Sequence, residues 1–153
     1  MVDYTNFKIS VINQKLFVSN CLLILTFMTS CNSANSKEDL SKEIQSVSSW
    51  AATVQMVANA WLKSNVPKKY AQQTLNKAQT EFLSEKKKIS QIKPSTNVIQ
   101  HHQSLILTNV SQLANQTEKM SKTIAQNNHS QVQQELKQLE IEVQKINQLK
   151  TIP

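Results

Sequence analysis

Residues 36–64 read SKEDLSKEIQSVSSWAATVQMVANAWLKS, and this stretch decides the fold because its apolar side chains recur every three or four positions. The repeating positions are Leu40, Ile44, Val47, Ala51, Val54, Ala58, Trp61 and Leu62. An α-helix has about 3.6 residues per turn, so these side chains share one helical face. Pro67 disfavours helical geometry at the residue before it, which ends the segment. The stretch therefore predicts an amphipathic helix over residues 37–64.

The same apolar spacing recurs in three further segments of the chain. Pro67 suits the first position of a second helix, and Pro94 separates that helix from a third. Asn127 and Asn128 can adopt the left-handed backbone that closes a helix, so they separate the third helix from a fourth. We therefore expect helices over residues 67–92, 96–126 and 130–149, all within one helical domain that covers residues 37–153.

The chain has no glycine among its 153 residues. Tight β-hairpins, phosphate-binding loops and nucleophile elbows all depend on glycine, so the sequence argues against a sheet protein and against those sites. The expected fold is all-α: an up-down-up-down four-helix bundle, because short connections favour antiparallel neighbours. The alternative is a long helical hairpin, in which the third and fourth helices form one coiled-coil rod that pairs with a second chain.

The formal net charge is +7, and all seventeen basic residues are lysines. Nucleic acid is not an expected partner, because the lysines are scattered, aromatic residues make up only 5% of the chain, and no nucleic-acid-binding motif is present. Anionic lipid or a cell-wall polymer is the more suitable counter-charge. The simpler alternative is a solvated, lysine-rich surface without a specific partner.

The first thirty residues have the pattern of a signal peptide. Lys8 and Lys15 precede an apolar run of thirteen residues, 16–28, which is too short to cross a bilayer as a helix. The quartet Met28-Thr29-Ser30-Cys31 then resembles the lipobox of bacterial lipoproteins, in which small residues precede a lipidated cysteine. The resemblance covers residues 1–31 only.

This resemblance implies that residues 1–30 are removed by cleavage between Ser30 and Cys31, and that the thiol of Cys31 carries a diacyl group. Residues 31–36 would then form a lipidated cysteine with a short polar tether to a membrane. Two or more acyl chains hold a protein stably on a membrane, whereas one chain does not. In Gram-negative lipoproteins, aspartate directly after the lipidated cysteine retains the protein in the inner membrane. Asn32 stands at this position instead, so the outer membrane is the expected location in a Gram-negative cell.

The sequence shows no motif for catalysis, a metal ion or a cofactor. His101 and His102 are adjacent and point about 100° apart on a helix, and neither they nor His129 belongs to a metal-binding pattern. One polar contact is predicted from helix register. Glu85 and His102 lie at similar distances from the turn at Pro94 and on or beside the apolar stripes, so we expect them to satisfy one another.

We therefore expect a lipid-anchored envelope protein, not an enzyme, whose helical domain has an interaction or structural accessory role. Its expected partners are the membrane, through the acyl chains on Cys31, and a second protein. The alternative is a carrier that holds an apolar small molecule in the bundle core. Small side chains on facing stripes could leave room for such a ligand, and an enclosed apolar cavity of roughly 300 Å³ or more would favour the carrier.

Overall fold

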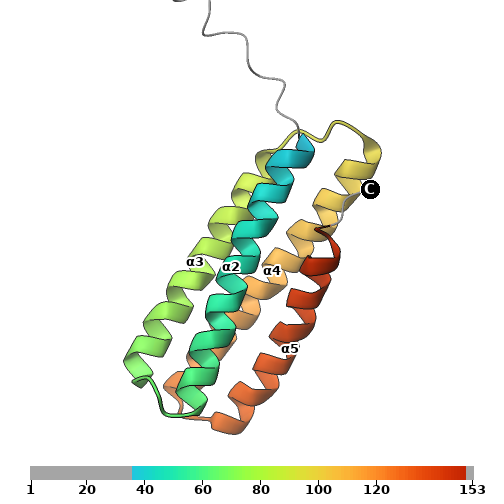
Figure 1. The fold of residues 1–153 in the computed structure, drawn as a ribbon. Coiled ribbons are helices and arrows are strands. Elements are labelled where there is room, and N and C mark those ends of the chain that lie inside the picture. The colour runs from blue at the N-terminus through green and yellow to red at the C-terminus, as the bar shows by residue number, and fades with distance from the viewer. Residues whose placement is uncertain (1–35, 151–153) are drawn as a thin grey trace, which may run out of the picture. The chain divides into compact units, whose positions relative to one another are not determined.

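The computed structural model describes residues 36–150, so the expected signal peptide and Cys31 lie outside the described residues. Within this range the chain forms four α-helices, shown in Figure 1. They are α2 (Ser36–Leu62), α3 (Lys68–Gln91), α4 (Asn97–Ala125) and α5 (His129–Gln148). No helix in residues 36–150 is both long and apolar enough to cross a membrane.

The helices form the up-down-up-down four-helix bundle that the sequence predicts. Each helix runs antiparallel to the next along the chain, and α5 returns to pack against α2 (Figure 1). Across the bundle, α2 also contacts α4. Because the chain reverses direction between Ala125 and His129, α4 and α5 do not form the continuous rod of the alternative prediction.

The apolar stripes meet in one core, as their spacing predicts. In α2, Leu40, Ile44, Val47 and Val54 are completely buried, and α3 contributes Phe82, the largest fully buried side chain. Burial of such stripes supplies most of the stability of a helical bundle, because short isolated helices are marginal in water. The core thus runs the length of all four helices.

Two residues with positive φ replace the glycines that usually end helices. Ser64 has φ 58° just after α2, and Asn127 has φ 55° just after α4. Asn127 was expected to adopt this geometry, since asparagine tolerates it better than most residues. Asn128 and Thr96 then cap the following helices: their side chains accept hydrogen bonds from the backbone N–H of Gln131 at 3.1 Å and of Ile99 at 3.2 Å.

Candidate functional site

The predicted contact between Glu85 and His102 is wrong, because each of the two side chains contacts another partner. Glu85 is buried, as expected, but its carboxylate accepts from Ser46 Oγ at 2.9 Å on α2 and lies 2.9 Å from Lys88 Nζ. His102 Nε2 lies 3.2 Å from the backbone oxygen of Leu149, at the end of α5. The two side chains therefore have partners on different helices rather than each other.

The physical reason is the direction in which each side chain leaves its helix. The number of residues between a side chain and the α3–α4 turn sets only its height along the helix axis. Its angle around the helix decides which neighbouring helix it faces. Glu85 faces α2 and His102 faces α5. The next residue along α4, Gln103, makes the contact across the hairpin instead, with Nε2 donating to the backbone oxygens of Ile89 at 2.5 Å and Ile92 at 2.8 Å.

A cluster of two carboxyl groups and one ammonium joins α2 to α3. Lys88 Nζ lies 2.9 Å from Glu85 Oε1 and 3.7 Å from Glu43 Oε2. The second carboxylate oxygen of Glu85 is buried and accepts no hydrogen bond from a donor in the described residues. A protonated Glu43 could supply the missing donor, because a neutral carboxyl group has an O–H.

The pKa values of the two carboxyl groups agree with a shared proton. The hydrogen bond with Glu85 is the main cause that raises the pKa of Glu43 to about 7, followed by burial and by repulsion from Glu85, with Lys88 opposing. Burial acts to raise the pKa of Glu85, but hydrogen bonds with Glu43, Lys88 and Ser46 outweigh it and lower that pKa. In mildly acidic solution, below the Glu43 pKa of about 7, the pair therefore holds one proton, mainly on Glu43.

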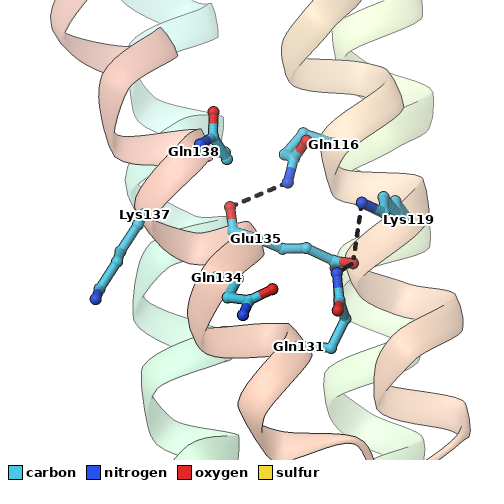
Figure 2. Close-up of a pocket in the computed structure, with 7 residues that line it drawn as sticks. All are labelled: Gln116, Lys119, Gln131, Gln134, Glu135, Lys137 and Gln138. Atoms are coloured by element: carbon cyan, nitrogen blue, oxygen red, sulfur yellow. Dashed lines mark hydrogen bonds and ion pairs between the residues drawn. The ribbon is translucent and has the colours of Figure 1, made fainter.

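A second polar site is a surface groove of about 320 Å³ between α4 and α5, shown in Figure 2. Its lining consists of Gln116, Lys119, Gln131, Gln134, Glu135, Lys137 and Gln138. Glu135 is 1% exposed, and its Oε1 accepts from Thr123 Oγ1 at 3.0 Å and Gln131 Nε2 at 3.2 Å. Lys119 Nζ lies 3.6 Å from the same oxygen. These contacts offset part of the cost of burying the carboxylate.

The functional groups that line this groove are polar, and the aliphatic parts of the same side chains form about half of its surface. Amides and charges line it, so it can exchange hydrogen bonds with a polar molecule, whereas a carrier of an apolar ligand needs an apolar enclosure. The small residues on the facing apolar stripes are buried in the core; they are Ala51, Ala58, Ala71 and Ala78. Small residues at such positions also let helices approach closely.

Sequence reasoning missed Glu43, Gln103 and Glu135. A signal for Glu135 is present in the spacing, since it falls between Val132 and Leu139 at intervals of three and four, in the phase of the buried stripe. Gln103 likewise precedes the stripe residue Ile106 by three positions. Polar residues at core positions of an amphipathic helix are therefore the places to look for cross-helix hydrogen bonds.

At one end of the bundle, three parts of the chain meet. Ser36 Oγ, at the start of α2, donates to Ser95 Oγ in the loop between α3 and α4 at 3.0 Å. His102 fixes the end of α5 to the beginning of α4 through Leu149. At the opposite end, the ring of Trp61 stacks on His129, with centroids 4.2 Å apart. One end of the bundle thus holds the start of α2 to the α3–α4 loop and the end of α5 to α4, and the opposite end holds α2 to α5.

Among residues 36–150, no group of three or more His, Cys, Asp or Glu side chains is arranged to hold a metal ion. Cys31, the expected lipid-attachment residue, and Ser30 lie outside the described residues. No protein-family model, no curated protein and no solved structure matches this chain.

Proposed function

We propose that this chain is a lipid-anchored protein of the bacterial cell envelope, whose four-helix bundle acts as an interaction or structural accessory domain. The lipobox-like quartet that ends at Cys31 is the sequence basis of the anchor. The structural observation that supports the proposal is the position of Ser36, which begins α2 at one extreme end of the bundle. A tether that enters there holds the bundle by its end and leaves all four helical sides free.

The dimensions of such an anchored bundle follow from chain geometry. Ser36 lies five residue steps after Cys31, and an extended chain spans at most about 3.5 Å per step, so the tether reaches about 18 Å. Helix α4 has 29 residues and is about 44 Å long at 1.5 Å per residue. A bundle that stands on its tether would present the turn at Asn127 several nanometres from the membrane surface.

An accessory role agrees with what the described residues offer chemically. The accessible polar features are the groove at Glu135 and the exposed helix surfaces, which carry hydrogen-bonding and charged groups. Such surfaces suit contact with another polar surface in the envelope. In a Gram-negative cell we place the protein at the periplasmic face of the outer membrane, since Asn32 follows Cys31.

The test of the anchor is replacement of Cys31 by serine, with Cys21→Ser as the matched control. Metabolic labelling with a fatty-acid analogue and membrane fractionation measure the result. Cys31→Ser should abolish labelling and release the protein from membranes, whereas Cys21→Ser should leave both unchanged. A Cys31→Ser protein that is labelled and fractionated like the wild type would refute the proposal.

The accessory role needs a second experiment on the native lipidated protein. Chemical crosslinking in intact cells, followed by purification from solubilised membranes, should recover a defined envelope partner. Charge-reversal of Lys137 at the edge of the groove should reduce that crosslink if the partner binds there. Recovery of the bundle without any specific crosslinked partner would argue against an interaction role.

A further inference from the structure

The bundle end where α2 begins carries a group of exposed lysines. Lys93 lies two residues before Ser95, whose hydroxyl contacts the first residue of α2. Lys86 and Lys87 lie within the last two turns of α3, which run to the same end (Figure 1). Lys150 follows the end of α5. All four lysines are exposed, and they come from three separate parts of the chain.

These four lysines differ from Lys42 and Lys88, which make ion pairs, and the same end also carries Glu38 and Asp39 in the first turn of α2. Lys42 pairs with Glu38 at 3.1 Å and Lys88 pairs with Glu85 at 2.9 Å. By contrast, the lysines at 86, 87, 93 and 150 make no ion pair with another residue of the described range 36–150. Their positive charge is therefore available to an external anion.

An exposed apolar residue lies at the same end. Val98 is in the first turn of α4, and 60% of its surface is accessible. Lysine side chains beside an apolar residue are typical of protein surfaces that contact a membrane, where the ammonium groups lie at the headgroups and the apolar side chain enters the interface.

We infer that this surface, which we call the basic end (Lys86, Lys87, Lys93, Val98 and Lys150), contacts anionic phospholipid headgroups of the membrane that holds the acyl chains. The inference rests on the proposed lipid anchor at Cys31. A tether of at most about 18 Å keeps the basic end close to the bilayer. Electrostatic attraction acts over about 8–10 Å at physiological salt, so a modest tilt of the bundle brings these lysines into range.

The opposite end of the bundle provides a natural control. Lys63, Lys68 and Lys69 lie at the turn between α2 and α3, and all three are exposed. They carry a similar amount of positive charge, but they lie about the length of α3 from the tethered end. If charge alone governs contact with the membrane, both ends behave alike. If the tether selects the contact, only the basic end responds to the lipid.

The experiment uses the full lipidated protein, whose acylation is first confirmed by intact mass. The protein is reconstituted into vesicles of phosphatidylcholine alone or with about 30% phosphatidylglycerol, and each lysine is modified with an amine-specific reagent and quantified by mass spectrometry. Each lysine near an anionic surface shifts the contact equilibrium by about fivefold. We expect the lysines of the basic end to react at least several-fold more slowly in the anionic vesicles, and Lys68 and Lys69 to react equally in both.

Two charge-matched variants complete the test. In Lys86→Gln/Lys87→Gln/Lys93→Gln, the remaining Lys150 should lose its protection in anionic vesicles. In the control that replaces Lys63, Lys68 and Lys69 by glutamine, Lys150 should keep its protection, and salt of about 0.5 M should remove it in this control and in the wild type. Equal reactivity of Lys150 in the two vesicle types, or equal protection at both ends, would overturn the inference. A protein without acyl groups would instead refute the anchor itself, which the mass measurement detects separately.

Discussion

Replacement of Glu43 by glutamine should remove a pH dependence of stability that the carboxyl pair at the α2–α3 contact creates. In the wild type, Glu43 has a raised pKa of about 7, so it is mainly protonated in mildly acidic solution and can then donate to the unpartnered oxygen of Glu85. A glutamine amide donates a hydrogen bond at every pH. The variant should therefore keep the contact where the wild type loses it.

The sign follows from proton linkage. The pKa of Glu43 rises from an ordinary value of 4.5 to about 7 on folding, so the folded state binds more protons between these values. The stability that Glu43 contributes is full below about pH 4.5 and is lost as the pH rises through about 7. Glu85, with its lowered pKa, has the opposite effect, and its contribution is lost as the solution becomes acidic. The pair therefore favours folding most in mildly acidic solution.

The same two pKa values set an upper limit on the change in the free energy of unfolding. One pKa unit corresponds to about 1.4 kcal/mol, so the change at Glu43 amounts to at most about 3 kcal/mol. The Glu43 side chain is 25% exposed and can turn towards water when it ionises, which reduces the effect. We expect Glu43→Gln to be more stable than the wild type by about 1–2 kcal/mol near pH 8, and equally stable near pH 5.

Urea denaturation followed by circular dichroism, at several values between about pH 5 and pH 8, measures the difference in the free energy of unfolding. The matched control is Glu38→Gln, since Glu38 is exposed and pairs only with lysine at the surface of α2. Any pH effect that the three proteins share cancels in the comparison. If Glu43→Gln keeps the wild-type slope with pH, or loses stability near pH 8, the shared proton is refuted.

Three further predictions concern stability and are measured by the same urea titrations. Phe82→Ala should lower the free energy of unfolding by about 3–5 kcal/mol because the ring is fully buried. Leu83→Ala, at an exposed position, should lower it by less than about 1 kcal/mol. Equal losses would contradict the assigned faces of α3. Ser64→Gly should stabilise the protein by about 0.5–1 kcal/mol, because Ser64 has positive φ and glycine adopts positive φ freely. Asn127→Gly should stabilise it by less, because asparagine already tolerates positive φ. Destabilisation by both substitutions would show that positive φ carries no cost at these positions. Gln103→Leu should lower the free energy of unfolding by about 1–2 kcal/mol, because the backbone oxygens of Ile89 and Ile92 lose the Gln103 donor and Ile89 keeps only the N–H of Ile92. An unchanged midpoint would show that the Gln103 hydrogen bonds contribute nothing to stability.

The polar contacts show where reasoning from sequence reached its limit. Burial of Glu85 followed from its place on the apolar stripe of α3, but its partner did not, because the partner depends on the rotation of α3 relative to both of its neighbours. The ion pair with Lys88 is local and was within reach of helical spacing. The contact with Ser46 joins residues 39 positions apart, which no local pattern specifies.

The amino-acid sequence by itself determined the four helices, their antiparallel order and the faces that form the core. It did so because local signals specify each of these: apolar period, proline positions, the Asn127 turn and the absence of glycine. Only the tertiary structure decided which helices lie side by side, which polar residues meet, and that α2 begins beside the lysine-bearing loop. Those features depend on the packing angles of whole helices, and packing angles are set jointly by every side chain in the core.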